Sequence, residues 1–140
     1  TDGAVVAYGS MVYPAMQAAE KLAKSGVNIS GVNARFVKPL DAELLLSTAR
    51  EVPLIVTVEE AYLAGGFGSA VMELLEANDL QDKVKVVRMG VPDEIVSHGD
   101  PNRLLGDYGL DADGIYKRVL DSLNALNAEK SGGRKIRAVK

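Results

Sequence analysis

The 140-residue sequence predicts one three-layer α/β/α domain with a mostly parallel sheet of about five strands. Short apolar runs of strand length alternate, from one end of the chain to the other, with segments whose apolar residues recur at helical spacing. Parallel strands need long crossover connections, and the helical segments supply them. Hydrophobic residues make up 47% and charged residues 25% of the chain, a composition typical of globular proteins.

The first third of the chain supplies two strands and the helix between them. Residues 4–8 are short and apolar, as in a buried strand. Residues 12–23 repeat apolar side chains at helical spacing, and Pro14 falls in the first turn, where its missing N–H costs no hydrogen bond. Gly26 is placed to end this helix, and residues 27–34 predict a second strand.

The middle of the chain continues this alternation. Asp41 is predicted to cap a helix that starts after Pro39. Residues 54–58 form the clearest strand of the sequence, apolar at every position except one. A helix over residues 69–77 and a fourth strand over residues 84–89 follow.

Acidic residues mark the starts of the last two helices. Asp100 and Pro101 are predicted as the N-cap and first residue of a short helix, and Asp111 opens the final one. We expect residues 1–127 to form the domain and residues 128–140 to be a basic, disordered tail. The tail carries a net charge of +4 and the body −7. An acidic body does not attract a phosphate backbone, so no nucleic-acid partner is expected.

Several classes of function are excluded by composition. The sequence has no cysteine, which excludes cysteine-ligated zinc, iron–sulfur clusters and thiol catalysis. A single histidine, His98, cannot supply a metal site built from several histidines. No apolar run has the length of a membrane span and no signal peptide opens the chain, so we expect a cytosolic protein without a membrane partner.

Polar and glycine-rich residues gather where the predicted strands end. In open parallel sheets, ligands and partners meet the carboxyl ends of the strands. These ends carry Gly9-Ser10, Arg35-Phe36, Glu59-Glu60 and Gly90–Asp93. The sequence therefore points to this edge of the sheet as the functional one.

The segment Gly65-Gly66-Phe67-Gly68 follows the third strand. It departs from a dinucleotide fingerprint, because Val71 occupies the slot of the third glycine and Arg88 stands where an acidic residue is needed. A tight, closely packed entry into a helix, or an interface loop, is the favoured interpretation.

Four charged residues near this edge are candidates with more than one interpretation. Glu59 and Glu60 are neighbours in an extended strand and point to opposite faces, so we do not expect them to act as a pair on one substrate; one of them is expected to face a cleft or a partner. Arg35 is suited to a phosphate, to a carboxylate across an interface, or to a salt bridge with Asp41 or Asp93. His98 is predicted in a loop, as a surface hydrogen-bonding residue or a substrate contact.

Several sequence blocks together resemble the C-terminal domain of the transketolase-like thiamine diphosphate enzymes. A later run is more selective and is similar to the 1-deoxy-D-xylulose-5-phosphate synthase family. The blocks are Ala7–Ser10, Asn33–Asp41, Thr57–Glu60 and Gly65–Val71, and the selective run comprises Gly90–Asp93, His98-Gly99 and Gly109–Ile115.

The resemblance implies a domain of an enzyme that condenses pyruvate with D-glyceraldehyde 3-phosphate and releases carbon dioxide, using thiamine diphosphate and Mg²⁺. In that family the first two domains hold the cofactor, through a Gly-Asp-Gly motif that this sequence lacks. No catalytic, cofactor-binding or metal-binding residue is therefore carried over, and we expect the chain alone to bind no cofactor and to be inactive. Its expected partners are the N-terminal and middle domains of the same polypeptide and a second copy in a homodimer.

The expected contribution of this chain is an interface between domains or the rim of an active site. The residues assigned to that role are Ser10, Arg35, Glu59, Glu60, Gly65, Gly66, Gly68 and His98. Two alternatives stay open, the C-terminal domain of a 2-oxoacid dehydrogenase E1 β subunit and a stand-alone, non-catalytic interaction module. The chain begins with Thr1 and not with methionine, so a piece of a longer protein is expected.

Overall fold

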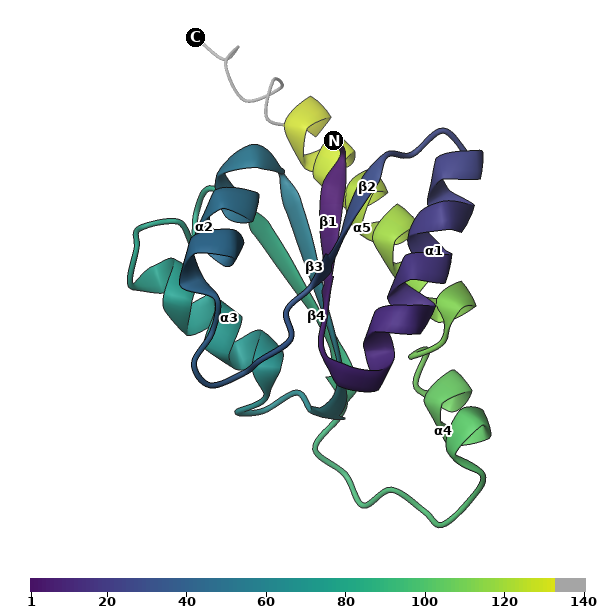
Figure 1. Ribbon diagram of the computed structural model, residues 1–140. Helices are drawn as coiled ribbons and strands as arrows, with labels where there is room; N and C mark the ends of the chain where they lie inside the picture. Colours follow the sequence, from purple (N-terminus) through teal and green to yellow (C-terminus); the bar gives the residue numbers. More distant parts are fainter. Residues whose placement is uncertain (133–140) are drawn as a thin grey trace, which may run out of the picture.

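The computed structural model describes residues 1–132 and shows three layers, with helices on both faces of a parallel sheet (Figure 1). The elements are β1 (Gly3–Ala7), a 3₁₀ turn η1 (Gly9–Met11), α1 (Val12–Lys24), β2 (Ile29–Asn33), α2 (Ala42–Glu51), β3 (Leu54–Tyr62), α3 (Phe67–Glu76), β4 (Lys85–Val91), α4 (Pro101–Asp107) and α5 (Ala112–Gly132). The predicted three-layer fold is confirmed. The expected number of strands is corrected, because the described residues form four strands and not about five.

The strand order is β2-β1-β3-β4, and every pair is parallel. Strands β1 and β3 are central, and all five residues of β1 are buried. One face of the sheet packs against α1 and α5, and the other against α2 and α3. Two apolar cores result, one on each face, as expected for a parallel sheet covered on both sides.

The predicted helix starts are confirmed by their capping hydrogen bonds. The side chain of Asp41 accepts a hydrogen bond from the N–H of Leu44 at 3.1 Å. The side chain of Asp100 accepts one from the N–H of Arg103 at 3.0 Å, directly before Pro101. Each carboxylate thus satisfies an N–H that has no partner within its own helix, which fixes where the helix begins.

The final helix is longer than the predicted domain boundary implies. Asp111 opens α5 by accepting a hydrogen bond from the N–H of Gly114 at 2.7 Å, and the helix continues to Gly132. The boundary predicted at residue 127 therefore falls inside α5, and residues 133–140 of the predicted tail lie outside the described residues. Within the described part of the chain, no helix combines the length and apolar character needed to cross a bilayer.

Strand β3 is also longer than predicted, and this changes the position of the acidic pair. The strand continues from Val58 to Tyr62, with an irregularity in its pairing to β4 between these two residues. Glu59 and Glu60 thus lie within the irregular end of β3 and not after it. Because both residues belong to the strand, their side chains point to opposite sides of it.

Candidate functional site

The carboxyl ends of β1 and β3 are tied together at the surface. The hydroxyl of Ser10, which follows β1, donates a hydrogen bond to the carboxylate of Glu60 in β3. Both residues are exposed, and they are 50 positions apart in the sequence. The parallel arrangement brings them together, as the position of both residues at strand ends predicts.

Glu59 points the other way and into the domain. Its side chain is buried, with 1% of its surface exposed. Its carboxylate accepts hydrogen bonds from the N–H of Phe67 at 2.6 Å and the N–H of Gly68 at 2.8 Å. These are the first N–H groups of α3, and a carboxylate there also compensates the positive end of the helix dipole. Glu59 therefore holds the start of α3 in place of a capping side chain, because the N-cap residue is Gly66.

The glycines of the loop are required by close packing around this carboxylate. A side chain at Gly66 would overlap the carboxylate of Glu59 and the carbonyl oxygen of Tyr62. A Cβ at Gly68 would lie 2.6 Å from the Thr57 hydroxyl oxygen, too close for any real side chain. Gly65 has a φ of 70°, in the left-handed region that favours glycine. The loop is thus a tight entry into a helix, as one interpretation of its sequence predicts.

Arg88 fixes the same loop from the neighbouring strand, a role that the sequence did not reveal. Its guanidinium donates hydrogen bonds to the carbonyl oxygen of Leu63 and to the hydroxyl of Ser69, both at 2.8 Å. The hydroxyl of Ser69 in turn donates to the Leu63 carbonyl at 2.9 Å. An arginine in the middle of a mostly apolar strand was the available signal, but its partners depend on how the loop folds back onto β4.

Arg35 and His98 are exposed and separate from this hydrogen-bonded group. Arg35 has a φ of 57°, and its guanidinium lies 6.0 Å from the centre of the neighbouring Phe36 ring. The one ion pair among the described side chains is Lys21–Asp113 at 2.5 Å, so neither Asp41 nor Asp93 forms a salt bridge with Arg35. His98 lies in the connection between β4 and α4. The predicted site residues therefore include buried ones, such as Glu59 and Gly68, and exposed ones, such as Arg35 and His98.

Large apolar side chains are exposed around the same edge. Tyr13 follows β1, Phe36 follows β2, Tyr62 ends β3 and Ile95 follows β4. Their exposed fractions are 72%, 60%, 50% and 98% respectively. Single exposed apolar residues are ordinary, but here one ends or follows each of the four strands. We call these four residues the carboxyl-edge residues.

The connection that carries Ile95 is fastened at one point. The hydroxyl of Tyr108, just after α4, donates a hydrogen bond to the carboxylate of Glu94 at 2.7 Å. This bond, together with the negative charge of Glu94, raises the pKa of Tyr108 above its ordinary value of 10.0. Ile95 thus stands out from a loop whose base is held.

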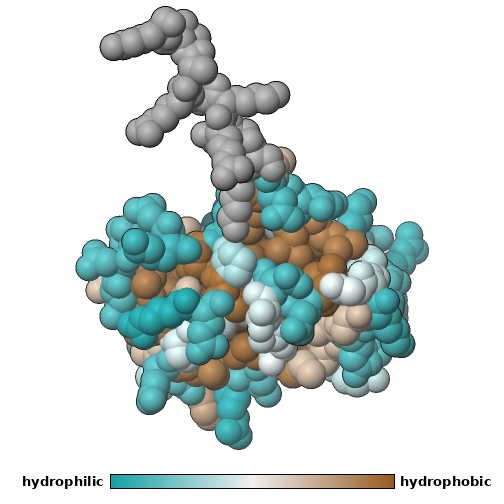
Figure 2. All heavy atoms as spheres, turned by 90° about the horizontal axis from the view of Figure 1, so that it is seen from above, coloured by the Kyte–Doolittle hydropathy of each residue, from teal (hydrophilic) through white to brown (hydrophobic). Residues whose placement is uncertain are grey.

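The opposite end of the strands exposes apolar surface of a different kind. Figure 2 shows hydrophobic side chains reaching the surface at the end of the molecule where β1 begins. A groove of about 380 Å³ lies there, lined in part by Val27, Pro53, Leu120, Leu123 and Leu126. All five side chains are half-buried. Among the described residues, these five apolar side chains are less exposed than the carboxyl-edge residues.

The acidic side chains and the histidine do not gather into a metal site within the described residues. Among the described residues, no group of three or more histidine, aspartate or glutamate side chains lies close enough together to hold a metal ion. Glu59, the one buried carboxylate of the described residues, accepts its two hydrogen bonds from the backbone of α3. The geometry of the described residues therefore supports a docking edge stiffened from inside.

The family model for the C-terminal domain of transketolase matches residues 1–115 of the chain. A 1-deoxy-D-xylulose-5-phosphate synthase of Geobacter metallireducens is 53% identical over 118 residues, which are 84% of this chain and 19% of that protein. The synthase of Symbiobacterium thermophilum is 51% identical over 118 residues, covering 84% of this chain and 18% of that protein. The chain thus spans about a fifth of the length of the curated relatives that it matches.

A solved structure agrees with the fold. It is described as a split-gene transketolase in an inactive β4 tetramer, and it is 36% identical in sequence with a TM-score of 0.79. The match covers 88% of this chain and 39% of that one.

Proposed function

The chain belongs to the transketolase C-terminal domain family, and on that premise we propose that it is the C-terminal domain of a 1-deoxy-D-xylulose-5-phosphate synthase. Such an enzyme is a transferase that joins pyruvate to D-glyceraldehyde 3-phosphate and releases carbon dioxide. Its product feeds the synthesis of isoprenoids, thiamine and pyridoxal phosphate. The observation that carries the proposal is 53% identity over 118 residues to a relative with that name.

Within the enzyme, this domain acts in packing and dimer assembly. The buried hydrogen bonds from the start of α3 to the Glu59 carboxylate, called here the Glu59 clamp, fix the loop at residues 65–68. The carboxyl-edge residues present apolar surface at the same edge. Ser10 and Glu60 add a polar pair at the same edge. An interface with an apolar centre and polar groups around it is the usual composition of a protein–protein contact.

Thiamine diphosphate and Mg²⁺ belong to the other domains of the proposed enzyme. The Gly-Asp-Gly motif that holds the cofactor in that family does not occur in this sequence. The partners of the carboxyl edge are then the N-terminal and middle domains of the same polypeptide and a second copy of it. The solved relative, named as a tetramer, supports association between copies.

The test uses the natural polypeptide that carries this segment, in which Phe36→Ser and Ile95→Ser are combined. Both side chains are mostly exposed, so the isolated 140-residue chain should unfold at the same temperature with or without the changes. In the natural polypeptide, we expect a weaker dimer by sedimentation and at least a tenfold loss of synthase activity. The control is Ala23→Ser, a change at an exposed position near the C-terminal end of α1, away from the carboxyl edge, and it should leave assembly and activity unchanged.

Unchanged assembly and activity in the double variant would argue against the docking role while leaving the enzyme assignment intact. Failure of the natural polypeptide to form product from pyruvate and D-glyceraldehyde 3-phosphate would overturn the enzyme assignment itself. Turnover by the isolated chain would overturn the proposal that the chemistry lies in other domains.

A further inference from the structure

The outer edge of β4 carries backbone groups without a partner strand. The N–H of Lys85 donates to the carbonyl of Pro53 at 3.0 Å, and the carbonyl of Val91 accepts from the N–H of Leu63 at 2.9 Å. The backbone groups of Lys85 and Val91, at the two ends of β4, therefore point toward β3. Because alternate residues of a strand bond to opposite sides, Val86, Arg88 and Gly90 turn theirs outward. Within residues 1–132, no strand pairs with that side.

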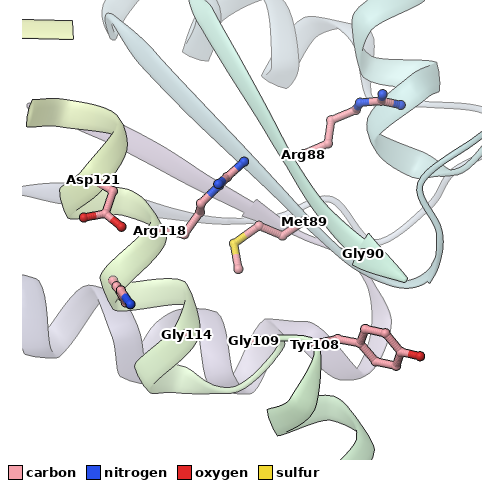
Figure 3. Close-up of a pocket in the computed structure, with 9 residues that line it drawn as sticks. Arg88, Met89, Gly90, Tyr108, Gly109, Gly114, Arg118 and Asp121 are labelled. Atoms are coloured by element: carbon pink, nitrogen blue, oxygen red, sulfur yellow. The ribbon is translucent and has the colours of Figure 1, made fainter. Parts of the chain in front are cut away.

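A groove lies on each side of this edge strand. On one face, α5 packs against α1 and β3, and a cavity of about 400 Å³ remains between α5 and β4. Figure 3 shows Met89 and Arg118 directed toward this space, whereas Arg88 points to the opposite face of the sheet. On that face, a second cavity of about 360 Å³ lies between β4 and α3. An added strand places alternate side chains on the two faces of a sheet, so it would fill both grooves.

The two grooves differ in charge. The α3 groove is lined by Glu73 and Glu76 together with Arg88, whose guanidinium is turned inward to the carbonyl of Leu63. The α5 groove is lined by Lys117 and Arg118 together with one carboxylate, Asp121. None of these side chains forms an ion pair with another described side chain. The α3 groove therefore favours a cation and the α5 groove an anion.

We propose that the outer edge of β4 binds an extended peptide segment of another polypeptide chain by strand addition. The segment has basic side chains at alternate positions, which face α3, and acidic side chains at the intervening positions, which face α5. Backbone hydrogen bonds to Val86, Arg88 and Gly90 supply affinity, and the charges supply specificity. None of the carboxyl-edge residues lines either groove, and this binding does not rest on the proposed enzyme.

A second copy of this chain fits the edge poorly. Two β4 strands paired about a twofold axis perpendicular to the sheet would place the α3 face of one beside the α3 face of the other. Glu73 and Glu76 would then face the same two residues of the second copy, and like charges would meet.

A strand that followed α5 directly onto this edge is also disfavoured. Helix α1 lies on the same face as α5 and leads from β1 to β2, which is the direction away from the outer edge of β4. If β1-α1-β2 is right-handed, a connection from β4 through α5 to the outer edge would be left-handed, and such crossovers are rare. The occupant is therefore sought in another polypeptide.

The test uses two synthetic eight-residue peptides of the same composition, built from valine, threonine, lysine and glutamate. In the sorted peptide, all lysines occupy one set of alternate positions and all glutamates the other. In the mixed peptide, both charges occur in both sets. Binding to the 140-residue chain is followed by the amide NMR shifts of Val86, Arg88 and Gly90. We expect the sorted peptide to bind at least tenfold more tightly, and its N-methylated form not to bind.

Variants of the grooves test the charge assignment. Glu73→Lys combined with Glu76→Lys should weaken binding of the sorted peptide at least tenfold, whereas Glu43→Lys on α2 should leave it unchanged. Both changed positions are exposed, so folding is not at risk. Equal affinity for the two peptides, or shifts confined to another surface, would overturn the proposal. Slow hydrogen exchange of these three amides in the free chain would also overturn it, because the edge would then already be occupied. The occupant would be a second copy if the chain is a dimer, or residues 133–140 if their removal from a monomer abolishes the protection.

Discussion

Gly66 lies so close to Glu59 that a single methyl group at residue 66 would overlap the Glu59 carboxylate. The same carboxylate accepts hydrogen bonds from the two backbone N–H groups that begin α3. A buried charge is stable here because it is hydrogen-bonded to the helix start. The position of the Glu59 carboxylate therefore requires a residue without a side chain at position 66.

Replacement of Gly66 by alanine should destabilise the domain by about 2 kcal/mol or more, because the methyl group must displace the carboxylate or the loop. Gly106→Ala is the matched control. It lies inside α4, where an added Cβ meets nothing closer than 3.5 Å. Urea denaturation of both variants measures the difference, and equal midpoints would contradict the assigned packing.

Glu59→Gln should lower stability by about 2 kcal/mol, the contribution of hydrogen bonds to a charged group. A glutamine amide can accept only through its oxygen, so one of the two N–H groups of α3 loses its partner. Glu60→Gln is the neighbouring control, since Glu60 is exposed and its change is expected to cost less than about 0.5 kcal/mol. Thermal unfolding compares the two variants. A Glu60→Gln variant that unfolds at a lower temperature than the Glu59→Gln variant would contradict the role of Glu59 at the start of α3.

Thr57→Val should leave stability unchanged or raise it by about 1 kcal/mol, since its buried hydroxyl has no hydrogen-bond partner among the described residues. Thr57→Ser keeps the hydroxyl and loses a buried methyl group, so it should destabilise by about 1 kcal/mol. A valine variant less stable than the serine variant would show that the hydroxyl has a partner.

Glu94→Gln should lower the pKa of Tyr108 toward 10, because the hydrogen bond to the Glu94 carboxylate and its charge raise that pKa in the folded chain. A raised pKa in the folded state means that the bond stabilises fully below about pH 10, and that this contribution is lost as the pH rises through the raised pKa. NMR titration of the Tyr108 ring tests this. An identical titration in both proteins would show that the loop is not held there.

The sequence predicted most elements because their signals are local. Asp41, Asp100 and Asp111 each cap the predicted helix, and the capping carboxylate acts within three residues of its own position. The extent of β3 was not predictable in this way. Residues 59–62 are two glutamates, an alanine and a tyrosine, which lack the apolar pattern of a buried strand. They continue the strand because Tyr62 pairs with Val91 and the N–H of Leu63 bonds to the Val91 carbonyl.

The candidate site was predicted in part. The position of Ser10 and Glu60 at strand ends was enough to expect them at one edge, because parallel strands align their carboxyl ends. The inward turn of Glu59 and the bridge from Arg88 to Leu63 depend on contacts between segments up to 25 residues apart. Sequence spacing carries no signal for such contacts, so these residues became visible only in the folded chain.

The mass of the natural polypeptide that carries this segment tests the central proposal most directly. An antibody raised against the 140-residue chain, used to blot an extract of the source cells, measures it. Since the 118 matched residues are 19% of the Geobacter synthase, we expect a band between four and five times as heavy as the 140-residue segment. A band about twice its mass would instead indicate a two-domain subunit such as a 2-oxoacid dehydrogenase β subunit. A band at the mass of the chain itself would contradict the synthase assignment.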